Sequence, residues 1–126
     1  MSTSNDAAAT VARVATEREL RLIAPGRKSG LPRAVTIWFA VLDDGCVGLG
    51  TLNEDRDWVR NARHAGRVEL QLAGVRLRGR FADATDPVRH RAIRKAMARK
   101  YLPFRIAAWL GLGQRFTFVV DALEIV

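Results

Sequence analysis

Six segments of the chain are predicted to be β-strands, and most of them alternate apolar and polar residues with a period of two, the pattern of a half-buried strand. In the first of them, Leu20 and Leu22 alternate with Glu19 and Arg21. The predicted strands span residues 18–24, 33–41, 46–51, 67–72, 75–81 and 115–126. Several are separated by short turns that contain glycine, and such turns favour antiparallel pairing.

Two of these strands depart from simple alternation. Residues 33–41 read RAVTIWFAV, with β-branched and aromatic residues on both faces. This composition predicts a strand buried on both sides, central in a barrel or facing a partner subunit or a ligand. The strand 46–51 carries Gly48 and Gly50, and glycine within a strand indicates a bulge or a close approach of backbone or ligand.

The clearest hairpin joins the strands 67–72 and 75–81. If Ala73 and Gly74 alone form its loop, Glu69 lies opposite Arg78, which suits cross-strand pairing. Alanine is poorly suited to a positive φ, so a longer loop with Gly74 in the left-handed region, and therefore another register, is the alternative.

Helical periodicity is found in four other segments. Residues 53–66 place Trp58 and Asn61 three positions apart, on one side of a helix. The alanine-rich stretch 7–16 predicts a short or frayed helix, and residues 102–113 a second, apolar helical or loop segment. A helix with a strong start at Pro87 carries an apolar stripe formed by Val88, Ala92, Ala96 and Met97.

These elements predict a mainly β protein, an antiparallel β-barrel, closed or split, with a few short helices. Residues 1–17 are expected to form an N-terminal extension or a short helix, and residues 18–126 a single domain. The apolar fraction of 48% is enough for a core.

The amino-acid composition narrows the range of functions that the protein can have. The net charge of +8 favours an anionic partner, which leaves nucleic acid, membrane headgroups and phosphorylated small molecules open. A single cysteine, Cys46, and two histidines cannot assemble a zinc site, and no metal site is expected. The N-terminus lacks the basic start and continuous apolar segment of a signal peptide, so we expect a soluble cytoplasmic protein.

The segment GRKSGLPR, residues 26–33, concentrates cations in a glycine-rich turn. Glycines allow close backbone approach, Lys28 supplies a point charge, and Arg33 can make a bidentate contact with an anion. A β-rich run follows, so the segment is not a Walker phosphate loop, which needs a helix there. The alternative to an anion site is a solvated cationic turn.

Two further groups invite a functional interpretation. Trp58 and Asn61, beside a glycine-bearing strand, could hold a planar heteroaromatic ring, or Trp58 could simply belong to the core. The basic helix over residues 87–100 could contact phosphates or anionic lipids, or it could present only a solvated face.

Together, GRKSGLPR, the following apolar strand, the glycine-bearing strand and DWVRNARHAGRVELQLAG resemble the deazaflavin-dependent nitroreductase family. That family belongs to a superfamily of split β-barrels that bind flavin or deazaflavin, and the pyridoxamine 5′-phosphate oxidases are related to it. Its members typically show Gly-Arg-Lys-Ser-Gly-x-x-Arg, and later a Trp followed three residues on by Asn. The resemblance covers residues 20–84, and more loosely continues to residue 124.

The resemblance implies a six-stranded antiparallel split barrel of the FMN-binding type, a homodimer, and a cofactor in a cleft near the subunit interface. Lys28 and Arg33 would bind the cofactor's phosphate, beside Arg27, and Ser29 and Gly30 would shape the turn. The implied residues along or around the ring system are Gly50, Thr51, Leu52, Trp58 and Asn61. A substrate pocket would involve Trp38, Tyr101 and Trp109.

The chain also departs from the family pattern. Thr36 replaces the usual proline in the second strand, the loop before Trp58 is shorter, and Tyr101 is the only tyrosine where relatives place several. Substrate class and cofactor identity are therefore open. No residue is assigned a catalytic role.

The leading expectation is an oxidoreductase that uses a reduced deazaflavin, coenzyme F-420, to transfer hydride to a nitro compound, a quinone or an enone. One alternative is the same barrel acting as a flavoprotein with FMN. Another is a non-catalytic cofactor carrier, or a basic module that binds nucleic acid or membrane.

Overall fold

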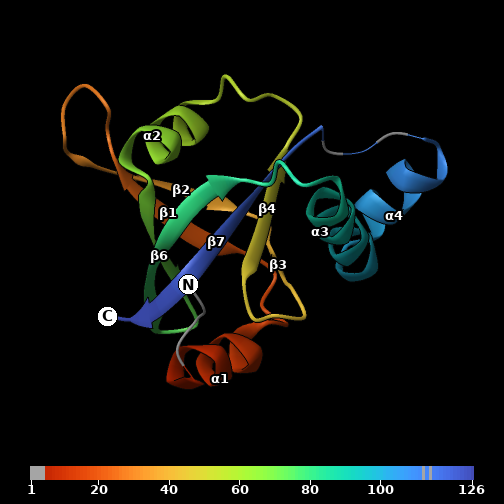
Figure 1. The fold of residues 1–126 in the computed structure, drawn as a ribbon, viewed down its shortest axis with the longest axis horizontal. Coiled ribbons are helices and arrows are strands. Elements are labelled where there is room, and N and C mark those ends of the chain that lie inside the picture. Colours follow the sequence, from red (N-terminus) through yellow and green to blue (C-terminus); the bar gives the residue numbers. More distant parts are fainter. Residues whose placement is uncertain (1–4, 112, 114) are drawn as a thin grey trace.

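Within residues 5–111, 113 and 115–126, which the computed structural model describes, the strands form one antiparallel sheet curled into a half-barrel (Figure 1). Its seven strands are β1 (Leu20–Pro25), β2 (Pro32–Ile37), β3 (Ala40–Val41), β4 (Val47–Thr51), β5 (Arg67–Leu72), β6 (Val75–Asp83) and β7 (Phe116–Ile125). Their order in the sheet is β2-β1-β5-β6-β7-β4-β3. The mainly β class and the antiparallel pairing predicted from the sequence are confirmed.

The prediction of six strands is wrong by one, because residues 33–41 form two strands and not one. β2 is an edge strand, and Arg33, Ala34 and Thr36 on it are exposed rather than buried. β3 forms the opposite edge of the sheet, and only Trp38 and Phe39 separate it from β2. This short connection brings the two edges together and so requires the sheet to curl.

The apolar character of both faces of residues 33–41 has a different cause from the one predicted. Phe39 is 1% exposed and belongs to the core inside the half-barrel, whereas Trp38 packs against a second apolar cluster outside it. The segment therefore contributes to two cores as it crosses between them, and it is not a central strand.

The β5–β6 hairpin follows the shorter of the two predicted registers. Ala73 and Gly74 both have positive φ, at 49° and 76°, and form the loop. Glu69 lies opposite Arg78 as predicted, but its carboxylate pairs with Arg76, at 3.1 Å. The hydrogen bond from Arg76 holds the pKa of Glu69 below its ordinary value.

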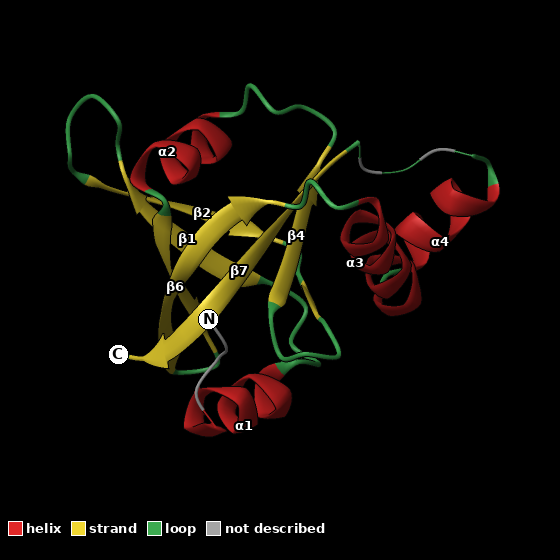
Figure 2. Ribbon diagram, in the orientation of Figure 1, coloured by secondary structure: helices red, strands yellow, loops and turns green. Residues whose placement is uncertain are grey.

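Four helices lie around the described part of the sheet (Figure 2). They are α1 (Asn5–Val14), α2 (Asp57–Ala65), α3 (Pro87–Lys100) and α4 (Leu102–Trp109). α1 and α2 lie at opposite ends of the half-barrel, and both contribute buried residues to its core, Val11 from α1 and Val59 from α2 (Figure 1). Gly66 ends α2 with a left-handed φ of 71°, which satisfies the backbone at that end.

α3 covers the outer face of the sheet with a side that differs from the predicted one. Ile93 and Met97 are buried in the second apolar cluster, whereas Val88 is 67% exposed and Ala92 is also exposed. Gly48 permits this packing, because a Cβ there would lie 3.1 Å from two side-chain carbons of Ile93. In the described residues, no helix has both the length and the apolar character needed to cross a membrane.

Candidate functional site: a cationic pocket between a strand loop and α2

The loop that joins β1 to β2 is closed on itself by hydrogen bonds. The Gly26 amide donates to the carbonyl of Leu31 at 2.8 Å, and the Gly30 amide donates to the carbonyl of Gly26 at 2.8 Å. Gly30 has φ +72°, a value that side chains disfavour. The hydroxyl of Ser29 accepts from the Leu31 amide at 3.2 Å, so Ser29 shapes the turn. The loop thus has a defined conformation that carries Lys28.

Asn61 of α2 fastens this loop to the helix. It is 6% exposed, and its Oδ1 accepts from the backbone amide of Arg27 at 3.1 Å and from Arg27 Nη1 at 2.8 Å. Arg27 Nη2 also lies 3.4 Å from the carboxylate of Asp57. Because a buried amide that loses its partner is costly, Asn61 fixes the position of the loop. Both hydrogen bonds from Arg27 go to the side-chain oxygen of Asn61.

A pocket of about 660 Å³ lies between the loop and α2, within the size range of small-molecule sites. It is lined by Leu22, Ala24, Gly26, Arg27, Lys28, Ser29, Arg33, Ala34, Val35, Arg56, Asp57, Trp58 and Asn61. Six of the predicted site residues, Arg27, Lys28, Ser29, Arg33, Trp58 and Asn61, therefore meet here. Gly30 belongs to the same loop and allows its turn.

The pocket is strongly positive. Four cations line it, and the single carboxylate, Asp57, lies beside Arg27. Among the described residues, no acidic group is within ion-pairing distance of Lys28, Arg33 or Arg56. The N-terminus of α2, which has no side-chain cap, opens on the same space and adds the partial positive charge of the helix. This arrangement favours an anion, and phosphate above all.

The inner part of the pocket is apolar. Leu22, Ala24 and Val35 from the two adjoining strands line it, together with the indole of Trp58. Trp58 is half-buried and makes edge contacts with Phe81 and Phe118, at ring-centroid distances of 6.3 and 5.7 Å. These contacts hold the indole in place. A ligand with a charged end and a flat apolar body would match both parts of the pocket.

The structure does not bring the predicted β4 residues into this pocket. Gly50, Thr51 and Leu52 lie at the end of β4, where the Thr51 hydroxyl and the backbone of Asn53 are 3.2 Å apart. Leu52 lines a different cavity of about 690 Å³ with residues of α3, α4 and the segment before β7, among them Phe104. Within the described chain, the predicted cofactor residues therefore fall into two separate groups.

Trp38 and Tyr101, two of the three residues predicted for the substrate pocket, lie side by side. Their rings stack at 4.5 Å between centroids, and Phe104 contacts both at its edge. The Tyr101 hydroxyl is buried, donates to the carbonyl of Arg18 at 2.7 Å, and accepts from the amide of Phe39 at 3.2 Å. Burial raises the pKa of Tyr101. These contacts tie three segments of backbone together.

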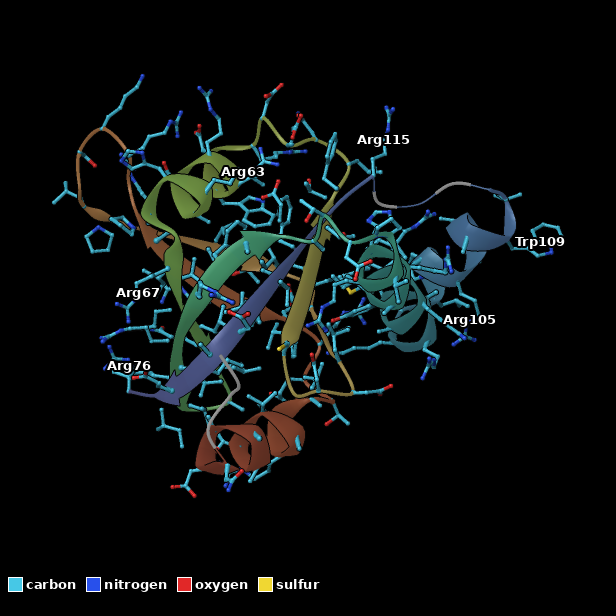
Figure 3. The ribbon with its side chains drawn as sticks, in the orientation of Figure 1. Arg63, Arg67, Arg76, Arg105, Trp109 and Arg115 are labelled. Carbon is cyan, nitrogen blue, oxygen red and sulfur yellow. The ribbon has the colours of Figure 1, made fainter. Side chains whose placement is uncertain are left out.

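Trp109, the third residue of the predicted substrate pocket, lies elsewhere. It is at the end of α4, is 84% exposed, and points away from the molecule (Figure 3). Among the described residues it makes no ring contact with Trp38 or Tyr101.

Sequence reasoning missed Arg56 and the apolar floor of the pocket. Arg56 directly precedes α2, and its position two residues before Trp58 was a usable signal, since the start of a helix collects groups around an anion site. Leu22, Ala24 and Val35 carried no signal, because buried strand residues look alike in sequence whether or not they line a pocket.

Comparisons with known proteins give the fold but no family. No family model matches the chain, and no curated protein matches its sequence. Three similar solved structures are described as dependent on F-420-H2, as FAD-binding and as heme-binding. An F-420-H2-dependent reductase is 20% identical, with TM-score 0.65 over 83% of this chain and 95% of that one. A FAD-binding protein from Mesorhizobium loti is 18% identical, with TM-score 0.63 over 97% and 91%. A heme-binding protein from Mycobacterium smegmatis is 16% identical, with TM-score 0.68 over 98% of this chain and 55% of that one.

Proposed function

We propose that this protein is an oxidoreductase that binds a reduced deazaflavin, coenzyme F-420, and transfers hydride from it to a small organic acceptor such as a nitro compound, a quinone or an enone. The observation that carries the proposal is the meeting of Lys28, Arg33 and Arg56 with Trp58 at one pocket. The similar fold of the F-420-H2-dependent reductase supports it, and so do the motifs that the sequence shares with deazaflavin-dependent nitroreductases.

The residues present fit a cofactor with an anionic tail. Lys28 and Arg33 would hold the tail at the mouth of the pocket, while Arg27 and Ser29 keep the loop in shape. Trp58 and the apolar floor would exclude water from one side of the flat ring system. Gly50, Thr51 and Leu52 would complete the ring site only from a second subunit, so the homodimer stays a prediction together with them.

When bound, the cofactor supplies the hydride. This chain would supply binding and orientation, through the cations and the apolar floor of the pocket. Lys28 and Arg33 would hold the tail equally before and during hydride transfer, so they would contribute to cofactor affinity and not to the chemical step. Trp38 and Tyr101 stay candidates for contact with the acceptor, although their hydrogen bonds and stacking also serve the fold.

The test is a titration of the purified protein with coenzyme F-420 and with FMN, side by side, followed by turnover of a quinone with the reduced deazaflavin. We expect saturable binding of coenzyme F-420 at physiological salt, and reduction of the quinone only when the reduced cofactor is present. Tighter binding of FMN, or a yellow protein as purified, would favour the flavoprotein alternative. Binding without turnover would favour a cofactor carrier. Binding of neither cofactor would overturn the proposal.

A further inference from the structure

The whole net charge of the protein lies in one segment. Residues 87–120, the basic segment, hold eight of the 21 cations and no Asp or Glu. The remaining 13 cations equal in number the 13 acidic residues, all of which lie elsewhere. The charge of +8 therefore belongs to α3, α4 and the residues up to the middle of β7.

Most of this charge is at the surface. The exposed cations of the basic segment are Arg91, Arg94, Lys95, Arg99, Arg105 and Arg115. Arg89 pairs with Asp44 at 2.8 Å, and Arg105 donates to the carbonyls of Ala98 and Arg99 at the end of α3. α3 and α4 pack together at one side of the molecule (Figure 1), and their exposed cations give that side a positive charge.

The same side carries the largest group of exposed apolar side chains. Leu102, Ile106, Trp109 and Leu110 are 59, 51, 84 and 58% exposed. Their spacing of four, three and one residues places them along one side of α4, opposite the side on which Phe104 packs against Trp38. Figure 3 shows Trp109 at the outer edge of the molecule. Exposed apolar residues gathered in this way mark an interaction surface.

We propose that the outer side of α4 docks on the surface of an anionic phospholipid bilayer. Leu102, Ile106 and Trp109 would enter the boundary between headgroups and acyl chains, and the flanking arginines and lysines would contact the headgroups. Trp is well suited to this boundary, and long cationic side chains reach back to the headgroups while their stems stay apolar. This binding surface is separate from the cationic pocket, which lies across the half-barrel at the β1–β2 loop (Figure 1).

Charge selects the bilayer over the other occupants. A second copy placed symmetrically on this surface would set the basic segment against itself, and eight like charges would repel eight others. A nucleic acid would match the cations but would leave the apolar side of α4 uncovered. Only an anionic surface with an apolar interior satisfies both features.

The test is co-sedimentation of the full chain with vesicles of phosphatidylcholine alone and of phosphatidylcholine mixed equally with phosphatidylglycerol. We expect strong preference for the anionic vesicles, and loss of binding as salt is raised. The emission of Trp109 should shift to the blue on binding, and Trp109→Phe should remove the shift while binding largely persists. Trp38 and Trp58 are half-buried and report little.

Matched variants separate the apolar and the cationic contributions. Ile106→Ser should weaken vesicle binding about tenfold. The control Ile125→Ser should leave vesicle binding unchanged, although Ile125 is as exposed as Ile106 (50% and 51%). The double variant Lys95→Gln, Arg99→Gln should weaken binding roughly thirtyfold. Arg67→Gln with Arg78→Gln, on the exposed face of β5 and β6, should leave it unchanged.

Three results would overturn the proposal. One is the absence of binding, or equal binding to both kinds of vesicle at low salt. Another is a self-association in solution that Ile106→Ser abolishes, which would assign the surface to a second copy. The third is binding of duplex DNA that anionic vesicles cannot displace. Circular dichroism of each variant shows whether it is folded, so a loss of structure is not mistaken for a loss of binding.

Discussion

Two cation-rich regions of this protein look alike in sequence and differ in shape. In the β1–β2 loop, Lys28 and Arg33 surround a pocket of about 660 Å³ with an apolar floor. In the basic segment, the cations surround an apolar side of α4 that projects outward, with Trp109 84% exposed. The first region is a pocket that can enclose a small anion, whereas the outer side of α4 projects outward and suits an extended surface. The cavity that Arg94 and Arg115 line, between α3, α4 and the segment before β7, is separate from that outer side.

The difference comes from how the backbone is held. The loop of residues 26–31 is closed by its own hydrogen bonds and fastened to α2 by Asn61. α4 contacts the rest of the protein mainly through α3 and the aromatic residues around Phe104. Charge alone therefore does not define a site, and the elements that position the charge decide what it can bind.

Removal of the pocket cations should have the largest effect. We expect the double variant Lys28→Ala, Arg33→Ala to weaken deazaflavin binding by about 3 kcal/mol, roughly a hundredfold, because hydrogen bonds to charged groups contribute about 1.5–3 kcal/mol each. The rate constant of hydride transfer at saturation should change little. Titration of cofactor fluorescence and single-turnover kinetics measure the two quantities.

The matched control for this variant is Lys95→Ala with Arg99→Ala, which removes the same number of cations from the basic segment. Its cofactor affinity should equal that of the wild type. Equal losses in both double variants would mean that only the overall charge attracts the cofactor, and the distinction between the two regions would then be wrong.

Two tryptophans, one in each region, should differ in their contribution to stability. Trp58→Ala should lower the free energy of unfolding by about 2–3 kcal/mol, because its indole packs against Phe81 and Phe118. Trp109→Ala should change it by less than about 0.5 kcal/mol, since Trp109 is almost fully exposed. Urea denaturation followed by circular dichroism compares them. A large loss for Trp109→Ala would show that a partner already covers α4.

Much of the fold could be predicted from the sequence because its strands alternate regularly. The β5–β6 hairpin, with Ala73 and Gly74 as its loop, has the shorter of the predicted registers. The error over residues 33–41 had a physical origin, since alternation within one segment does not reveal that the sheet curls. Phe39 and Trp38 serve different cores, and that depends on pairing with distant strands.

The candidate site was predictable only where its residues are adjacent in sequence or lie on one helix. The motif of residues 26–33 identified the loop side of the pocket, and the spacing of Trp58 and Asn61 identified the helix side. In the structure these two sides face each other across one pocket. Leu52 was expected in the same site, but its strand pairs with β7 and leads to another cavity. Distances between segments depend on strand order, which no local pattern encodes.

Lys100, the last cation of α3, refines the comparison because it belongs to the basic segment but points inward. Its Nζ is buried without a hydrogen-bond partner among the described residues and lies 3.4 Å from the centroid of the Phe39 ring. Burial lowers the pKa of Lys100 from 10.5 to about 8. The contact with the ring favours the charged form and partly offsets this cost.

The sign of the resulting pH dependence follows from proton binding. Between about pH 8 and pH 10.5 the unfolded chain keeps the Lys100 proton and the folded chain releases it, so this group raises the free energy of unfolding as pH rises. Burial raises the pKa of Cys46 from 9.0 to about 11, and that group lowers the free energy of unfolding as pH rises.

The difference in stability between Lys100→Met and the wild type isolates the effect of Lys100. We expect the variant to be more stable by about 1–2 kcal/mol below pH 8, with the difference shrinking toward pH 10.5. Lys95→Met, at an exposed position of the same helix, should show no such trend in urea denaturation, and the same pH slope in both variants would rule out a special role for Lys100.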